Sequence, residues 1–303
     1  MSTVDRPVVA GLDGSRESVA AAHWAAREAL RRGLPLRLLH AWEGLGNDDA
    51  ALPELRAPLE WAKRLLRSAM DELDETYPQL RITADRVAQP AVAALLSAGA
   101  EAELLVLGSQ GFGRVSGFLA GSVALATVAR AECPVVLVRS GESAEDEHLP
   151  DGAARPSTRT PCREVVLAVH AGQSCDAVIR FAFESAARRA APLRAVHYWY
   201  FPHAYGYAPG PMDGRARSQS QVNAEQALVT ALKPWRERFP AVEVSESVEN
   251  GRPAQQLIHA AEGAGLLVVG RRTRRGSIGA HTGPVAQAVM HQARCPVAVV
   301  PHD

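Results

Sequence analysis

This 303-residue chain has few cysteines and no long apolar run, two features that mark disulfide-rich, metal-binding and membrane proteins. Its four cysteines form no C-x-x-C pair and no metal-ligand spacing, which argues against a zinc site or a disulfide framework: Cys133, Cys162, Cys175 and Cys295. No apolar run approaches the ~20 residues that span a bilayer. The N-terminus enters a strand-like segment directly, without the pattern of a signal peptide. We therefore expect a cytoplasmic protein that has no membrane partner.

Lysine is also nearly absent, being confined to Lys63 and Lys233. The formal net charge is zero, and the chain has no dense basic stripe of the kind that binds nucleic acid. Residues 1–150 nevertheless carry 15 Lys and Arg against 21 Asp and Glu, whereas residues 151–303 carry 18 against 12. Halves of opposite charge can attract each other across a domain contact. Drift in surface charge after a duplication explains the asymmetry equally well.

The chain does contain an internal repeat. Equivalent positions lie 157 residues apart early in the repeat and 162 apart later, as in the pairs His40 and His197, Trp42 and Trp199, Gly108 and Gly270, and Cys133 and Cys295. The change of offset locates an insertion between Trp199 and Leu257. Residues 201–220, rich in Gly, Pro, Tyr and His, are predicted to form this insertion as a long surface loop.

Within each copy, strand-like and helix-like segments alternate. In the first copy we predict helices at 18–32, 57–76, 91–100 and 123–132, and strands beginning at residue 8 and at 36–42, 82–88, 104–108 and 134–138. Such alternation implies a parallel sheet wound with helices on both faces. We therefore predict an α/β fold made of two tandem doubly wound five-stranded parallel-sheet domains. In sheets of this kind, ligands bind beyond the carboxyl ends of the strands.

A spaced glycine signature follows the fourth predicted strand. Gly108 and Gly111 are separated by two residues, and nine residues later comes the pair Gly121-Ser122. Glycines here let main-chain N–H groups approach a bulky ligand without a Cβ in the way. The helix that begins near Val123 presents unpaired N–H groups and a dipole that favour an anion, and the Ser122 hydroxyl can donate to a phosphate oxygen or cap the helix. The signature predicts a phosphate site, although an ordinary strand–loop–helix turn can carry the same letters.

The second copy departs from this signature at positions that matter chemically. His170 stands where the first copy has Asp13, Thr273 replaces Gly111, and Pro284 replaces Ser122, which removes a hydroxyl and an N–H. We therefore expect nucleotide in the first half only. The alternative is that the arginines around the altered loop hold phosphates by side-chain charge: Arg271, Arg272, Arg274 and Arg275.

On the basis of these motifs, the chain resembles a tandem universal stress protein. The resemblance rests on the glycine signature, the opening strand that ends in Asp13-Gly14-Ser15 and the closing run Cys133 to Val138. The resemblance implies an adenine nucleotide alpha hydrolase-like fold, ATP as ligand and a divalent cation, normally Mg²⁺, with no protein ligand for the metal assigned. By the same resemblance, Asp13 and the main chain near Ala41 contact adenosine, Gly108 lies by the ribose, and the binding residues are Gly11, Asp13, Ser15, Ala41, Gly108, Gly111, Gly121, Ser122 and Val123.

The repeat also sets the domain organisation. We predict a first domain at 1–141, a polar linker of low order at 142–161 and a second domain at 162–303. The closing strands, 135–138 and 297–300, are apolar and are expected at sheet edges, which invite another strand. The two halves are therefore expected to pair with each other like a built-in dimer, and two chains to associate further as a homo-oligomer.

Three functional classes follow. The first is an ATP-binding stress or signalling module whose nucleotide occupancy favours one docking surface for a protein partner. The second is an enzyme, a slow ATPase or phosphotransferase that uses the same pocket. The third is a nucleotide-free dimerisation scaffold. We assign no catalytic residue, because no Ser-His-Asp order or paired carboxylates can be defended, and His40 and His197 are expected to be satisfied histidines that flank the pocket.

Overall fold

A computed structural model describes residues 5–42, 53–109, 122–170, 175–199, 214–273 and 282–303, with the backbone alone at 53–58, 199 and 214–218. The first half alternates strands and helices as predicted, and the boundaries differ from the expected ones by four residues at most. Its elements are β1 (Val8–Gly11), α1 (Arg16–Arg32), β2 (Leu36–Ala41), α2 (Pro53–Thr76), β3 (Ile82–Val87), α3 (Ala91–Glu101), β4 (Leu104–Ser109), α4 (Ser122–Arg130) and β5 (Val135–Arg139).

Local chemistry explains where α1 begins and ends. The Ser15 hydroxyl accepts a hydrogen bond from the backbone N–H of Ser18 and so caps the helix start. Gly33 follows the last turn with φ of 66°, a left-handed conformation that suits glycine, and its N–H reaches the carbonyls of Ala29 and Leu30. The predicted stop at Gly33 is therefore confirmed.

The second half repeats this order. Its elements are β6 (Val165–Ala168), α5 (Asp176–Arg189), β7 (Leu193–Trp199), α6 (Gly214–Arg238), β8 (Val244–Asn250), α7 (Pro253–Ala260), β9 (Leu266–Arg272), α8 (Pro284–Gln292) and β10 (Val297–His302). The predicted loop at 201–220 is wrong at its end, because residues 214–220 already form the first turns of α6. The rest of that loop lies outside the described residues.

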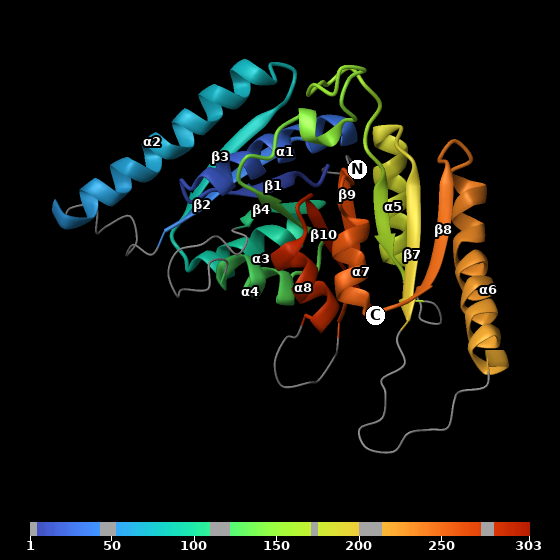
Figure 1. The fold of residues 1–303 in the computed structure, drawn as a ribbon. Coiled ribbons are helices and arrows are strands. Elements are labelled where there is room, and N and C mark those ends of the chain that lie inside the picture. The colour runs from blue at the N-terminus through green and yellow to red at the C-terminus, as the bar shows by residue number, and fades with distance from the viewer. Residues whose placement is uncertain (1–4, 43–52, 110–121, 171–174, 200–213, 274–281) are drawn as a thin grey trace.

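In the described residues the strands form one ten-stranded sheet in the order β3-β2-β1-β4-β5-β10-β9-β6-β7-β8 (Figure 1). All neighbours run parallel except β5 and β10, which pair antiparallel with Val136 opposite Ala298. The expected pairing of the two halves is thus confirmed. Because β5 and β10 run in opposite directions, the first-half strands finish at one end of the sheet and the second-half strands finish at the other end.

The sheet corrects the expectation that closing strands recruit another chain. β5 is hydrogen-bonded to β4 on one side and to β10 on the other, and β10 is held between β5 and β9. Neither strand keeps an open edge, so the physical basis for a homo-oligomer through the closing strands is lost. In the described part of the chain, the outer strands of the sheet are β3 and β8.

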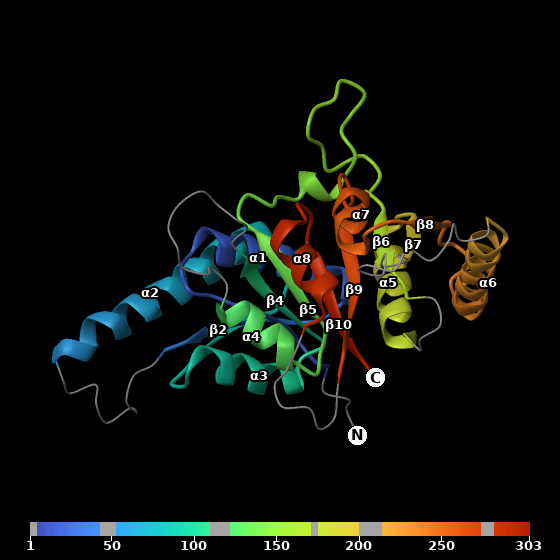
Figure 2. The same cartoon turned by 60° about the horizontal axis from the view of Figure 1, so that its bottom comes forward.

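Side chains at alternating strand positions pack into two hydrophobic cores, one on each face of the sheet. Val8 and Ala10 belong to the core beneath α1, α2, α5 and α6, whereas Val9, between them, belongs to the core beneath α3, α4, α7 and α8. Figures 1 and 2 show the latter four helices gathered on the same side of the sheet. The runs of apolar residues in β1, β4 and β5 follow from this arrangement, because strands covered on both faces need no polar side.

The segment between the halves is packed, so the prediction of low order there is wrong. It contains a 3-10 turn, Glu145–Glu147, and an isolated bridge that pairs His148 with Cys162. The Glu147 carboxylate is buried, 2.9 Å from Arg27 Nε and in contact with Arg31 of α1. A buried carboxylate needs such partners, and these two arginines attach the segment to the first half.

Helices α1 and α5 meet across the junction of the two halves through repeat-equivalent contacts. The guanidinium of Arg32 in α1 lies 5.3 Å from the ring of Phe181 in α5, and that of Arg189 in α5 lies 5.6 Å from the ring of Trp24 in α1. Between them, the fully buried Glu28 lies 2.6 Å from both Arg32 Nε and Arg189 Nη2. Burial raises the pKa of Glu28, but Arg189, Arg32 and Arg31 outweigh it and lower the pKa to about 2.

Candidate functional site

The first-half site lies where the central strands of that half end. Gly11 of β1 is in register with Leu39 of β2, and Ala10 with Val106 of β4. The sheet order reverses direction between β1 and β4, which is the position at which open α/β sheets bind ligands. The residues after these strands therefore converge, as the sequence predicted.

Asp13 and Ser15 belong to one hydrogen-bonded turn after β1. The Asp13 carboxylate accepts from Ser15 N–H at 2.9 Å and from the Ser15 hydroxyl at 2.5 Å. Partial burial raises the pKa of Asp13, but the bonds from Ser15 and Ser18 outweigh it, and the net pKa is below the ordinary value. The carboxylate is thus ionised, and one of its oxygens holds the turn that starts α1.

Packing requires a glycine at Gly108 and leaves little room at Gly11, both of which are predicted site residues. A Cβ on Gly108 would lie 2.6 Å from the carbonyl carbon of Glu17 and 2.7 Å from Ser18 N, inside the backbone of α1. A Cβ on Gly11 would lie 2.8 Å from a Leu107 methyl. Gly108 therefore serves close helix–strand approach, and this contact also brings it to the turn that carries Asp13 and Ser15.

The remaining predicted residues lie around the same edge. Ala41 ends β2, and Ser122 and Val123 begin α4, where both are exposed. Ser122 is therefore at a helix N-terminus, which favours an anion. Gly111 and Gly121 lie outside the described residues.

The sequence did not predict Trp61 as a neighbour of this site. Its indole comes from α2, is 45% exposed, and lies with its ring centre 5.6 Å from that of His40. It also closes over Gly14, whose added Cβ would be 2.9 Å from the indole. The position of Trp61 depends on how α2 lies over the strand ends, which no local pattern reveals. His40 itself is buried with Nδ1 2.7 Å from the Leu12 carbonyl, as expected of a satisfied histidine.

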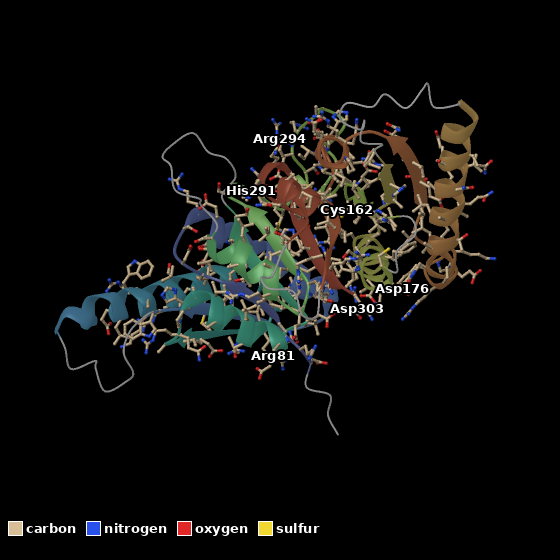
Figure 3. The ribbon with its side chains drawn as sticks, turned by 90° about the horizontal axis from the view of Figure 1, so that it is seen from below. Arg81, Cys162, Asp176, His291, Arg294 and Asp303 are labelled. Carbon is tan, nitrogen blue, oxygen red and sulfur yellow. The ribbon has the colours of Figure 1, made fainter. Side chains whose placement is uncertain are left out.

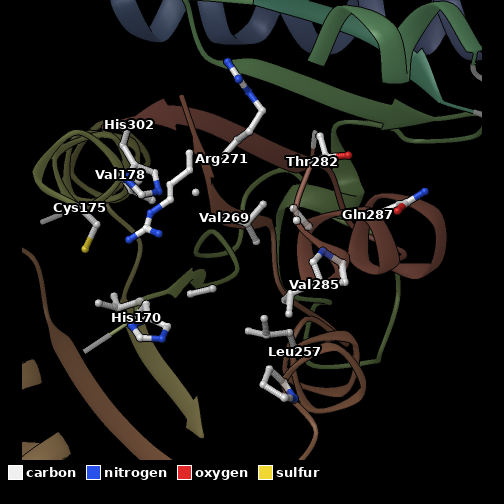
Figure 4. Close-up of a pocket in the computed structure, with 18 of the residues that line it drawn as sticks. His170, Cys175, Val178, Leu257, Val269, Arg271, Thr282, Val285, Gln287 and His302 are labelled. Atoms are coloured by element: carbon white, nitrogen blue, oxygen red, sulfur yellow. The ribbon is translucent and has the colours of Figure 1, made fainter. Parts of the chain in front are cut away.

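The second half contains a cavity of ≈ 1150 Å³ at the carboxyl ends of β6 and β9. Figure 4 shows His170 and His302 on one side of it, and Thr282, Val285 and Gln287 on the other. His197 repeats the contact of His40, with Nδ1 2.9 Å from a strand-end carbonyl. The sequence predicted that the phosphate cradle is lost here, and it gave no indication of a cavity of this size.

Each half also contacts the helix that follows the glycine segment of the other half. Arg271, at the end of β9, donates to the carbonyls of Ala129 and Ala131 at the end of α4. Arg139, at the end of β5, donates at 2.6 Å to the carbonyl of His291 in the last turn of α8. Figure 3 labels His291 on this helix. Cationic groups at helix C-termini are stabilising, so these contacts fasten the two halves together beside their sites.

In the part of the chain that the structure describes, no three His, Cys, Asp or Glu side chains lie together in a way that could hold a metal ion. Burial raises the pKa of Cys133 to about 11 and that of Cys295 to about 12, as expected for inert core thiols. Among the helices described, none combines the length and the apolar character needed to cross a membrane.

Comparison with known proteins agrees with this architecture. The sequence model of the universal stress protein family matches residues 6–139 and again 161–301. Two universal stress proteins of Mycobacterium tuberculosis, Rv2005c and Rv2623, are 33% and 32% identical over 302 residues; each alignment covers 96% of this chain, and 96% and 95% of those proteins. The crystal structure of a universal stress protein from Archaeoglobus fulgidus has the same fold, with a TM-score of 0.64, 16% identity and 98% of both chains covered.

Proposed function

Since the chain belongs to the universal stress protein family, we propose that it is a stress or signalling module that binds ATP in its first half and changes its choice of protein partner with occupancy. The proposal places it in the cytoplasm, where ATP is made and used. ATP is the ligand of family members that carry the intact glycine signature, and this chain carries it at 108–122.

The observation that carries the proposal is the convergence of an ionised carboxylate and an exposed helix N-terminus at one strand edge. Asp13 follows β1 and keeps a pKa below its ordinary value, so it can accept hydrogen bonds from a ribose or a base. Ser122 opens α4 and is exposed, so its hydroxyl and the helix N–H groups are available to phosphate. Gly108 lets α1, which follows the Asp13 turn, pack closely on β4, the strand that precedes α4.

The phosphates themselves would carry the divalent cation. Mg²⁺ usually keeps several waters and binds through one or two carboxylates plus substrate phosphates. ATP would supply charge and hydrogen-bond acceptors at this edge, and the chain would bind and orient it. Asp13 acts in binding, because one of its oxygens already accepts two bonds from Ser15.

Exchange of residues between the repeats tests the proposal. The variant Asp13→His with Ser122→Pro carries the second-half residues at both positions, and Pro suits the first turn of a helix. Calorimetric titration with Mg-ATP should give about one site per wild-type chain and an affinity about tenfold or more lower in the variant. The control Asp71→His makes the same chemical change at an exposed position of α2 and should bind as wild type.

Two outcomes would contradict the proposal. A stoichiometry near two would show that the second half also binds ATP. If the double variant bound ATP as tightly as wild type, the ATP site could not lie at these strand ends. Hydrolysis assayed on the same samples separates the enzyme alternative, since fast turnover lost in the double variant would make the protein an ATPase.

A further inference from the structure

The junction between α1 and α5 has an approximate twofold symmetry. It is formed by positions that correspond across the repeat: Trp24, Glu28 and Arg32 of α1, and Phe181, Ser185 and Arg189 of α5. The guanidinium carbon of each helix's arginine lies over the aromatic ring of the other helix, at 5.3 and 5.6 Å from the ring centres. The symmetry is broken at one position, where α1 has a carboxylate and α5 has a hydroxyl.

The Glu28 carboxylate binds both arginines of the junction. Its Oε1 accepts from Arg32 Nε, one turn later in the same helix, and its Oε2 accepts from Arg189 Nη2 of the other helix, each at 2.6 Å. A symmetric carboxylate at residue 185 would accept from Arg189 Nε in its own helix and from Arg32 Nη2 in the other. Ser185 is too short to do this. Within the described residues, those two nitrogens and the Ser185 hydroxyl have no hydrogen-bond partner.

These three groups without partners are buried. The side chains of Arg32 and Arg189 are each 2% exposed, and Ser185 is 0% exposed. A buried donor that lacks an acceptor is costly, more so when it is charged. In the part of the chain that the structure describes, five buried side-chain atoms lack a partner, and the other two are Trp24 Nε1 and Arg31 Nη1 of α1. The shortage of acceptors is therefore concentrated at this one junction.

The charges of the junction show a shortage of the same sign. Its ion-pair cluster contains four arginines and two buried carboxylates: Arg27, Arg31, Arg32, Arg189, Glu28 and Glu147. Four positive charges against two negative charges leave an excess of two. The excess is one if Glu103 is counted, which is half-exposed and lies 3.6 Å from Arg32 Nη1. A buried excess of charge is costly unless an opposite charge meets it.

A small anion satisfies these groups better than water does. The hydrogens of a water molecule need acceptors of their own, and a guanidinium group offers none. An anion accepts from several donors at once and also supplies the negative charge that the cluster lacks. Serine is smaller than glutamate, so an ion of a single atom suits the place that a second carboxylate would fill. A phosphate or an organic acid is too large for the same place.

We propose that the junction of α1 and α5 binds a monovalent halide, chloride, beside Ser185. Arg189 Nε, Arg32 Nη2 and the Ser185 hydroxyl donate to the ion, which takes the place of a second carboxylate. The ion belongs to the folded chain alone, because these donors come together only when the two halves pack. It fastens the halves at their junction, and it does so independently of any nucleotide at the strand ends.

Chloride should stabilise the wild-type chain, since a ligand that binds only the folded state raises its stability by mass action. Thermal melts at constant ionic strength measure this, with gluconate, which is too large for the site, replacing chloride. We expect the melting temperature to rise by about 2 °C or more between about 1 and about 200 mM chloride. Crystals grown in bromide locate the ion directly, and the anomalous peak should lie between Arg32, Arg189 and Ser185.

The variant Ser185→Glu supplies the second carboxylate in place of the ion. It should melt at the same temperature in low and in high chloride, and above wild type in low chloride. Ser185→Gln fills the same space without a charge, so it should also lose the chloride response but melt below Ser185→Glu. The matched control is Arg188→Gln, which removes the exposed neighbour of Arg189 that pairs with Glu184. This control should respond to chloride as wild type does.

Three outcomes would overturn the proposal. The first is a wild-type melting temperature that does not change with chloride. The second is a chloride response in Ser185→Glu equal to that of wild type. The third is bromide found at the protein surface only. If Ser185→Glu does not fold, the wild-type response and the bromide peak still decide the question.

Discussion

Two glycine pairs of the signature are kept in the repeat, Gly108 with Gly270 and Gly121 with Gly283, and the residues around them differ. Gly108 and Gly270 lie near the carboxyl ends of β4 and β9, where they pack against α1 and α5 respectively. Beyond them, Gly111 becomes Thr273 and Ser122 becomes Pro284. The glycine that packs against a helix is therefore present in both halves, whereas the residues at signature positions 111 and 122 differ between them.

The comparison of the two halves shows that the residues that form the fold are repeated, whereas the residues at the strand ends are not. The apolar strands, the two cores and the satisfied histidines His40 and His197 recur in both halves. At the strand ends, however, the first half has an ionised carboxylate, Asp13, whereas arginines and histidines line the cavity of the second half. A duplicated sheet can thus keep its packing while the charge at its strand ends changes sign, because the side chains at strand ends contribute little to the core.

We expect the largest loss of stability from a substitution at the junction of the two halves, at a position where the repeats differ. Glu28 is fully buried between Arg32 and Arg189, while the repeat-equivalent position in α5 is Ser185. Glu28→Gln leaves buried guanidinium charge without its partner and should lower the free energy of unfolding by about 3–5 kcal/mol. Urea denaturation measures this loss.

The matched control for that variant is Glu60→Gln, which removes an exposed carboxylate paired with Lys63. Exposed pairs of this kind contribute little to stability, so this variant should unfold close to wild type. A loss of less than about 1 kcal/mol in Glu28→Gln would mean that the junction does not depend on this carboxylate.

A second prediction concerns the two packing glycines. In Gly108→Ala the new Cβ meets the backbone of Glu17 and Ser18, which cannot move aside, whereas in Gly270→Ala it meets the His302 ring at 2.8 Å and a Val178 methyl at 3.2 Å. We expect a loss of about 3 kcal/mol for Gly108→Ala and about 1 kcal/mol for Gly270→Ala. Thermal melts of the two variants provide the measurement, and equal losses would contradict the packing explanation.

The smallest effect is a pH dependence in the segment between the halves, which has no counterpart in the repeat. Burial, with Asp146 and Glu147 nearby, raises the pKa of Glu142 from 4.5 to about 8. The folded state therefore keeps a proton that the unfolded chain loses, so stability falls as pH rises from about 4.5 to about 8. Glu142→Gln should remove this slope and raise stability at pH 8 by roughly 1–3 kcal/mol.

Thermal melts between pH 4.5 and pH 8 measure that slope in the Glu142 variant. The exposed Glu145→Gln in the same segment serves as control and should keep the wild-type slope. An unchanged slope in Glu142→Gln would assign the pH dependence to other groups.

Most of the fold could be predicted, and the reasons are local. Ser15 and Gly33 delimit α1 through their own capping chemistry, and the apolar runs of β1 and β4 identify strands covered on both faces. Asp13, Ser15 and Gly108 could be brought to one edge because parallel strands end together. The prediction of a linker of low order was wrong, because the burial of Glu147 depends on Arg27 and Arg31, which lie more than a hundred residues earlier in the chain.

The amino-acid order alone is enough to define a duplicated α/β arrangement, its element boundaries to within a few residues in the first half, and the strand end that carries the glycine signature, since each depends on short-range periodicity, caps and glycine spacing. The tertiary structure alone shows that β5 and β10 pair and so lose their open edges, that Trp61 closes over Gly14, and that a basic cavity lies beside β9. These features depend on how elements far apart in the chain pack against each other, and the free energy of such contacts depends on geometry that residue order does not display.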